Sequence, residues 1–281
     1  MGRAGRSGES AGGTHVTIEA RPGGELYARP RLVTALAECD FYHSVDVPGY
    51  GFVPGDWDLR GREHEYLGRV GVSGKRVLEV GPASGFLSFY LEQQGAEVVA
   101  FELSPDRAVD VVPYARADVE GLGRELADHI ARLTNAWWLS HRAFGSSARL
   151  VHGTVYDIPR ELGTFDLALL GSVLLHVRDP FLALENVAAR TRETLVVTDR
   201  MQSSFYRLPL RLSDRLGRAM FFRPDASTCE PQATWWRFSP QLLRRMLAVV
   251  GFEESSVTYH GQFFRGRRRP FFSVVGRRTQ G

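Results

Sequence analysis

The chain has 281 residues, of which 43% are hydrophobic, and its formal net charge is +3 at pH 7. A chain of this length can bury one sizeable core, so we expect one domain with added segments or two small domains. It contains no run of about 18 apolar residues, which argues against a membrane span. Its two cysteines, Cys39 and Cys229, lack the spacing of metal ligands. We therefore expect free, buried thiols in a cytoplasmic protein with no metal site.

The N-terminal part of the chain divides into a tail and a lead segment. Residues 1–14 are rich in glycine, serine and arginine and have no apolar stretch, so they predict a disordered tail and not a secretory signal. In the lead segment, residues 15–74, the pattern predicts a helix over Leu32–Cys39. A second helix is expected to follow residues 57–60 and to end near Val70.

From Lys75 onward, short apolar strands alternate with amphipathic helices. Buried strands are expected at residues 76–80, 97–102, 148–152, 165–170 and 194–198. Helices are expected between them, at residues 86–94, 106–144 and 181–190. This alternation predicts an α/β fold, with a doubly wound, mostly parallel sheet that is covered by helices on both faces.

The last part of the chain departs from that alternation. Residues 201–239 read as an aromatic insertion, and an amphipathic helix is expected at residues 241–250. Residues 255–260 and 270–276 then predict an antiparallel hairpin. Positive charges gather at its tip, on Arg265, Arg267, Arg268 and Arg269. We favour a solvated hairpin tip, with nucleic-acid binding as the alternative.

The first strand of the sheet runs directly into a loop with two glycines and then into a helix. Backbone N–H groups at the start of such a helix face the carboxyl edge of the sheet, where α/β proteins bind ligands. The dinucleotide pattern G-x-G-x-x-G fails here, because alanine and phenylalanine stand at its second and third glycines. What remains, E-x-G-x-x-x-G, suits a ligand without a pyrophosphate, such as the methionine half of S-adenosylmethionine (SAM). The loop residues expected to hold it are Glu79, Gly81, Pro82, Ala83 and Gly85.

Acidic residues follow the next two strands. Glu102 ends the second strand, and a carboxylate there accepts two hydrogen bonds from the vicinal hydroxyls of a ribose. Leu103, directly after it, offers an apolar face for an adenine ring. Asp157 follows the third strand, where it can accept from the adenine amine while Ile158 covers the ring. The glycine loop alone also fits a structural turn, and Glu102 alone fits a solvent-facing acid at a strand end, but the order of these elements favours a cofactor site.

This ordered set of strand and glycine loop, strand and acid, strand and acid resembles the class I SAM-dependent methyltransferases over about residues 75–198. The resemblance implies a Rossmann-like methyltransferase domain at residues 75–281, with SAM as the cofactor. It also implies that the end of the fourth strand, at Gly171, lies beside the transferred methyl group. His176 is then the first candidate for a general base or a substrate anchor. The alternative is that His176 only orients its own loop.

Further segments resemble the tRNA wobble-uridine carboxymethyltransferase-like proteins of that superfamily, at residues 57–60, 133–138, 175–180 and 234–240. In those proteins a tryptophan of the lead lies near the cofactor, which implies that Trp57 belongs to a lid formed by residues 15–74. Those enzymes act on tRNA with a carboxylated SAM. Here only one lysine is present, and Leu175 stands where that family has an aromatic residue. Ordinary SAM and a smaller acceptor are therefore favoured.

Aromatic and polar residues outside the sheet are expected to gather over its carboxyl edge, although most of these aromatics will form the core of the added segments. Candidate acceptor contacts are Tyr42, Trp138, Arg200, Trp235 and Trp236, and further catalytic candidates are His43 and His141. The preferred function is transfer of a methyl group from SAM to an O or N atom of a small molecule, in secondary metabolism. A tRNA-modifying enzyme and a non-catalytic nucleotide-binding module are the alternatives. The sequence does not predict the oligomeric state.

Overall fold

The structure of the chain is a computed structural model that describes residues 25–105, 107–201 and 219–279. The tail predicted at residues 1–14 and residues 202–218 of the aromatic insertion lie outside the described residues.

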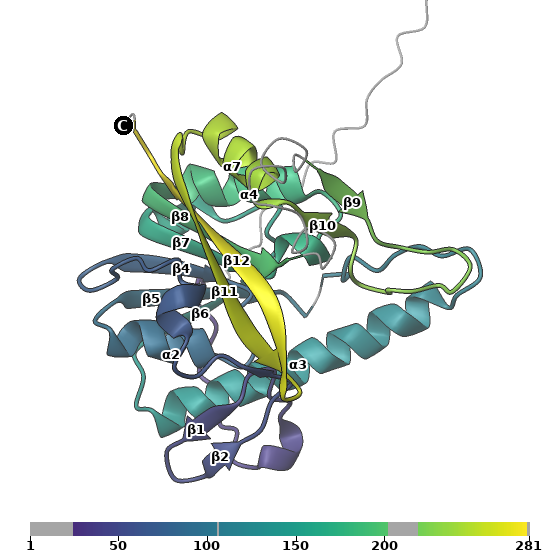
Figure 1. Ribbon diagram of the computed structural model, residues 1–281. Coiled ribbons are helices and arrows are strands. Elements are labelled where there is room, and N and C mark those ends of the chain that lie inside the picture. Colours follow the sequence, from purple (N-terminus) through teal and green to yellow (C-terminus); the bar gives the residue numbers. More distant parts are fainter. Residues whose placement is uncertain (1–24, 106, 202–218, 280–281) are drawn as a thin grey trace, which may run out of the picture.

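Within the described residues, the core is an eight-stranded sheet with the strand order β3-β11-β12-β8-β7-β4-β5-β6. Neighbouring parallel strands are β4 (Arg76–Val80), β5 (Glu97–Leu103), β6 (Arg149–Gly153), β7 (Phe165–Gly171) and β8 (Thr191–Arg200). β12 (Arg267–Arg277) pairs antiparallel with β8 and with β11 (Glu254–Phe264). β3 (Trp57–Asp58) pairs with the far edge of β11. The predicted doubly wound sheet is confirmed. The predicted C-terminal hairpin is also confirmed, and β11 and β12, which form it, are drawn in yellow in Figure 1.

The order of the strands creates a switch point in the sheet. The chain winds outward from β4 to β5 and β6, and then returns to place β7 on the other side of β4. Connections therefore leave the carboxyl ends of β4 and β7 in opposite directions and open the edge between them. Doubly wound proteins bind their ligands at this position.

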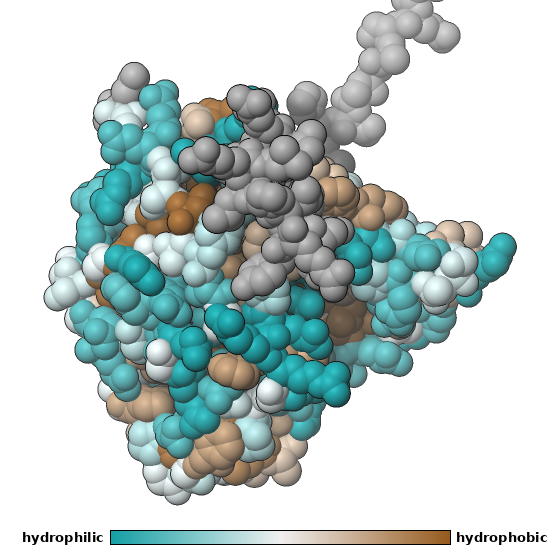
Figure 2. Space-filling model, viewed as in Figure 1, coloured by the Kyte–Doolittle hydropathy of each residue, from teal (hydrophilic) through white to brown (hydrophobic). Residues whose placement is uncertain are grey.

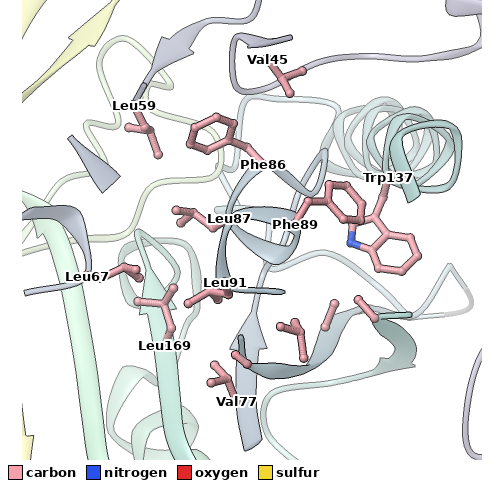
Figure 3. Close-up of a cluster of buried hydrophobic side chains, with 14 of the residues drawn as sticks. Val45, Leu59, Leu67, Val77, Phe86, Leu87, Phe89, Leu91, Trp137 and Leu169 are labelled. Atoms are coloured by element: carbon pink, nitrogen blue, oxygen red, sulfur yellow. The ribbon is translucent and has the colours of Figure 1, made fainter. Parts of the chain in front are cut away.

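Helices cover both faces of the sheet. The longest described helices are α2 (Phe86–Gln93), α3 (Val119–Ala143), α4 (Pro180–Arg190) and α7 (Pro240–Val249). α2 and α3 contribute to one core cluster, whereas α4 and α7 contribute to a second. Figure 3 shows the first cluster, in which the ring of Phe89 lies 5.6 Å from that of Trp137. Successive strand residues alternate between the clusters, as in Val77 and Leu78, because a strand repeats every two residues.

Two helices begin at a proline that follows a capping side chain. Asp179 accepts a hydrogen bond from the Leu182 N–H at the start of α4, and Ser239 accepts one from the Leu242 N–H at the start of α7. Such caps stabilise a helix by about 1 kcal/mol each. They explain why both helices begin within one residue of the predicted position.

Shorter elements surround the sheet. They are β1 (Val45–Val47), β2 (Gly51–Val53), β9 (Met220–Phe222), β10 (Trp236–Phe238), α1 (Glu63–Tyr66), and the 3-10 helices η1 (Leu36–Glu38), η2 (Arg160–Leu162) and η3 (Leu174–His176). β1 pairs with β2, and β9 pairs with β10, both antiparallel. Each pair forms a small sheet apart from the central one.

Two helix predictions were too long. The helix predicted over residues 32–39 is only η1, and the side chain of Leu32 is 79% exposed, so it has no core to pack against. The helix predicted from residue 106 begins at Val119, because Pro113 cannot continue a helix and Asp118 caps α3 by accepting from the Gly121 N–H. The helix expected after residues 57–60 is α1, which ends at Tyr66 and not near Val70, and residues 57 and 58 form β3.

The N-terminal half of α3 extends beyond the sheet. The buried residues of α3 all lie at or after Leu133, in the C-terminal half of the helix. Figure 1 shows the preceding turns projecting from the body, and Figure 2 shows a largely hydrophilic surface over them. No helix of the described residues is long and apolar enough to span a membrane. Both cysteines are free, but only Cys39 is buried, since Cys229 is half-buried.

Candidate active site

The glycine loop lies at the carboxyl end of β4 and has an unusual backbone. Gly81, Ala83 and Gly85 all have positive φ angles, of 71°, 50° and 88°. A Cβ atom on Gly81 would lie 2.7 Å from the side chain of Val173, and one on Gly85 would lie 2.5 Å from that of Phe89. The loop therefore requires glycine at both positions, because a side chain would clash with these neighbours and strain the backbone.

Glu102 is the penultimate residue of β5 and faces this loop. Its carboxylate accepts hydrogen bonds from the backbone N–H groups of Leu103, at 2.7 Å, and of Ala83. Burial raises the pKa of Glu102 to about 7, although the side chain stays partly accessible, as does that of Leu103. The second predicted element thus lies against the first, with a carboxylate held where a ribose would need it.

Glu79 supports the loop from inside the protein. Its side chain is buried and accepts a hydrogen bond from the Ser88 hydroxyl, which in turn accepts one from the Trp137 indole N–H at 3.1 Å. Burial raises the pKa of Glu79 to about 7. The carboxyl group ties β4, α2 and α3 together, so the structure gives it a supporting position beneath the loop.

The third predicted element is a turn after β6. The Asp157 N–H donates to the Thr154 carbonyl at 2.9 Å, and the Asp157 side chain is exposed. Ile158 is 5% exposed and belongs to the second core cluster, and Pro82 of the glycine loop is also buried. Asp157 therefore remains the predicted adenine contact of this turn.

His176 lies in η3, shortly after the end of β7. Its Nδ1 lies 2.5 Å from the Ala233 carbonyl oxygen. Because a carbonyl only accepts hydrogen bonds, Nδ1 carries the proton and Nε2 keeps a free electron pair. Desolvation by the surrounding protein lowers the pKa of His176. The bond to the Ala233 carbonyl opposes this shift and the charge of Arg237 adds to it, so the ring is neutral at pH 7. Its side chain is nevertheless exposed, as expected of a group that lines a binding site.

The alternative role for His176 is to orient its loop through Arg178 or Asp179. Other side chains bind the backbone of these two residues. The Arg178 N–H donates to the Asp110 carboxylate at 2.8 Å, and the Asp179 N–H donates to the Tyr156 hydroxyl at 3.1 Å. At the end of β7 itself, a Cβ on Gly171 would lie 3.0 Å from the Tyr66 hydroxyl. The imidazole of His176 is thus not needed to hold these backbone groups.

The lead segment is fastened to the glycine loop by Ser84, which the sequence did not single out. The Ser84 hydroxyl accepts hydrogen bonds from the backbone N–H groups of Tyr42, at 3.2 Å, and of His43, at 3.4 Å. The imidazole of His43 is 8% exposed, and its Nδ1 has no hydrogen-bond partner among the described residues. The predicted lid therefore contacts the glycine loop directly. His43 is a buried, neutral ring.

The pH dependence of stability should report on His43. Burial lowers its pKa from 6.5 to about 4, so between these values the unfolded chain binds a proton that the folded chain does not. His43 therefore lowers the free energy of unfolding as pH falls from 7, by about 2 kcal/mol at pH 5. Urea unfolding of wild type and His43→Phe at pH 7 and pH 5 should show a smaller loss for the variant. Equal losses would contradict the assignment, because His260 and all other groups are common to both proteins.

Trp57 and Tyr42 lie at the end of β8. The ring of Trp57 packs 4.8 Å from Phe264 and 5.2 Å from Phe271, and it is 7% exposed. The guanidinium of Arg200 lies 5.9 Å from its ring. The hydroxyl of Tyr42, a half-buried residue, accepts a hydrogen bond from the Trp57 indole N–H. The structure therefore brings together three residues that the sequence assigned to the cofactor lid and the acceptor.

Two predicted site residues on α3 were wrong. His141 Nε2 lies 3.0 Å from the Ala148 carbonyl, immediately before β6, at the amino edge of the sheet and away from the glycine loop. Trp138 is 3% exposed and packs edge-on against Trp137 at 4.7 Å. Both side chains lie on the face of α3 that packs on the protein, so they form core and not an acceptor site.

The tryptophans of the insertion also form hydrogen bonds within the protein. Trp235 is 6% exposed and donates its indole N–H to the Asp110 carbonyl at 2.7 Å, so its prediction as an acceptor contact was wrong. Trp236, which is half-buried, donates to the Val177 carbonyl at 3.1 Å. These bonds hold the segment around β10 over η3 and thereby bring Arg237 to the site.

Comparison with known proteins identifies the class of the chain. A family model described as a methyltransferase domain matches residues 58–257. The chain therefore belongs to this methyltransferase family. It is a SAM-dependent methyltransferase of the class I superfamily, as the glycine loop and Glu102 predicted.

Solved structures share the fold at low identity. The 1,6-didemethyltoxoflavin-N1-methyltransferase of Burkholderia thailandensis, with its acceptor and S-adenosylhomocysteine (SAH) bound, is 15% identical with a TM-score of 0.50; the match covers 79% of this chain and 78% of that one. A SAM-dependent methyltransferase of Methanosarcina mazei is 18% identical with a TM-score of 0.47, over 80% and 100% of the two chains. No curated protein matches the chain significantly.

Proposed function

We propose that this enzyme transfers a methyl group from SAM to an O or N atom of a small-molecule acceptor, as part of cytoplasmic secondary metabolism. The observation that carries the proposal is the placement of His176, with a free Nε2, after β7 and next to the switch point that holds the glycine loop and Glu102. The methyltransferase of similar fold from Burkholderia thailandensis acts on a small molecule, according to its name.

The residues present fit SAM. The glycine loop presents a backbone without side chains at Gly81 and Gly85, and Glu102 offers a partly accessible carboxylate for ribose hydroxyls. Asp157 would accept from the adenine amine, and Trp57 would cover the site from the lead segment. When bound, SAM supplies a sulfonium that makes its methyl group electrophilic.

The chain's own residues then orient the acceptor and move one proton. His176 Nε2 accepts the proton of an acceptor hydroxyl or amine, while Nδ1 stays fixed on the Ala233 carbonyl. Alignment of the reacting atoms alone can supply about 7–11 kcal/mol of the barrier reduction. Proton removal by a positioned base adds a factor of about 10² to 10⁴ when the nucleophile is a neutral hydroxyl.

The proposal is tested with SAH and labelled SAM. Calorimetry should show SAH binding, and a panel of hydroxylated and amino-substituted aromatic acceptors should yield labelled product from SAM. Absence of SAH binding would contradict the cofactor site and favour a non-catalytic module. SAH binding with transfer to tRNA alone would overturn the small-molecule acceptor.

A tRNA substrate is the second candidate, supported by the resemblance of several segments to the wobble-uridine carboxymethyltransferase-like proteins. The hairpin tip exposes Arg267 and Arg268, while Arg265 is engaged with Asp56 at 2.8 Å. Binding of tRNA through these arginines would weaken steeply with salt. Filter binding at increasing salt, with Arg267→Gln/Arg268→Gln as the variant, decides this candidate.

A further inference from the structure

Three arginines lie close together at the end of β8, beside the buried carboxylate of Asp199. Asp199 is 2% exposed and accepts a hydrogen bond from the Arg200 N–H at 2.6 Å. Arg237 Nη1, from β10, lies 3.8 Å from its Oδ1. Arg269, from β12, is close enough that its charge and that of Arg237 lower the pKa of Arg200. We call Arg200, Arg237 and Arg269 the arginine cluster.

Three donor atoms of the arginine cluster have no acceptor in the part of the chain that the structure describes. The Nε atoms of Arg200 and Arg269 and the Nη1 atom of Arg237 are buried and have no hydrogen-bond partner among the described residues. Guanidinium groups keep their charge even when buried, so one carboxylate leaves most of this positive charge uncompensated. Buried charged donors without acceptors are costly and therefore uncommon in folded proteins. Donors of this kind favour an anion as the partner of the arginine cluster.

The position of the arginine cluster points to the acceptor. Arg200 is the last residue of β8, the neighbour of β7 in the sheet, so it lies at the carboxyl edge, where β7 leads to His176. The charge of Arg237 contributes to lowering the pKa of His176, which shows that the two are close. The hydroxyl of Tyr42 is near enough to Arg200 for its charge to affect the Arg200 pKa. The arginine cluster is therefore part of the space that faces the general-base candidate.

We propose that the arginine cluster binds an oxyanion group of the acceptor, a carboxylate or a phosphate, and so selects acidic acceptors for methylation. The planar fork of a guanidinium donates two parallel hydrogen bonds to such a group, and three forks from different strands fix its direction. The inference rests on the proposed function, because it names the class of acceptor that the same site takes.

The methionine carboxylate of SAM is the competing occupant. The glycine loop and the N–H groups at the start of α2 lie at the end of β4, whereas the arginine cluster lies at the ends of β8 and β12, with β7 between β4 and β8. If the arginine cluster held the cofactor, its removal would weaken SAH binding. If it holds the acceptor, SAH binding stays unchanged.

The test measures anion binding to the SAH-loaded enzyme by calorimetry, with 4-hydroxybenzoate, 4-hydroxyphenyl phosphate and the neutral 4-hydroxybenzamide as probes. We expect at least one anionic probe to bind about tenfold more tightly than the amide. Arg237→Gln and Arg269→Gln should each weaken that binding about tenfold, since each removes a charge-assisted hydrogen bond. Arg277→Gln, on the exposed far end of β12, should leave it unchanged.

Asp199→Asn supplies a change in the opposite direction. Removing the competing carboxylate should tighten binding of the anionic probe several-fold, which partial unfolding of a variant cannot imitate. Equal binding of the anionic and neutral probes, or arginine variants that bind the anions as wild type does, would overturn the inference while the SAH result stands. Loss of SAH binding in the arginine variants would assign the arginine cluster to the cofactor and also overturn it. Failure of wild type to bind SAH would instead contradict the proposed function.

Discussion

Replacing Glu102 by alanine should weaken SAH binding by about 10- to 100-fold. A carboxylate at the end of β5 accepts hydrogen bonds from the ribose hydroxyls, and hydrogen bonds to a charged group contribute about 1.5–3 kcal/mol each. Glu102 also accepts from the Ala83 N–H of the glycine loop, so Glu102→Gln, which keeps a carbonyl oxygen for that bond, separates the ribose contact from an effect on the loop. Calorimetry with SAH measures the loss, and Glu97→Ala, at the exposed start of the same strand, is the matched control.

The same residue gives cofactor binding a pH dependence with a definite sign. Burial raises the pKa of Glu102 to about 7, so about half of the free enzyme is protonated there at neutral pH. Only the ionised carboxylate accepts both ribose hydroxyls, so binding releases a proton and weakens as pH falls below 7, by at most about tenfold per pH unit. Glu102→Gln should remove this dependence. If it persists in Glu102→Gln, the proton belongs to Glu79, whose pKa is also raised to about 7.

Much of the cofactor side of the site could be predicted from the sequence, because its parts are local. Each parallel strand is a short apolar run that ends at a polar residue or a glycine, and carboxyl ends of parallel strands share one edge. Order along the chain therefore carried Glu102 to the glycine loop without knowledge of any long-range contact. β4 was predicted to the residue, and β5 to within one.

The acceptor side could not be read in the same way, because its residues meet through distant pairings. Arg237 reaches Asp199 because Trp235 and Trp236 fasten their segment to backbone carbonyls elsewhere. Arg269 comes close to Arg200 because β12 pairs with β8. Trp138 and His141 suggested a site on α3, but the face of the helix on which they lie packs against the rest of the protein. Composition alone does not distinguish a buried aromatic face from a binding one.

His176→Asn should lower kcat by about 10² to 10⁴ with a hydroxyl acceptor, while SAH binding stays unchanged. Asparagine can still donate to the Ala233 carbonyl, so η3 keeps its backbone, but it has no nitrogen that takes up a proton. Single-turnover kinetics with labelled SAM measure the effect. A loss of the same size in SAH affinity would show instead that His176 shapes the cofactor site.

The pH profile separates a base from a positioning group. Surrounding protein and Arg237 lower the pKa of His176 from its usual 6.5, so the acid limb of kcat should lie below pH 6.5. His176→Asn should lose this limb. Arg237→Gln should move it to higher pH, because a nearby positive charge no longer opposes protonation of the imidazole. A variant that keeps both kcat and the acid limb would show that alignment of the acceptor is sufficient, and that its nucleophilic atom reaches the site already deprotonated.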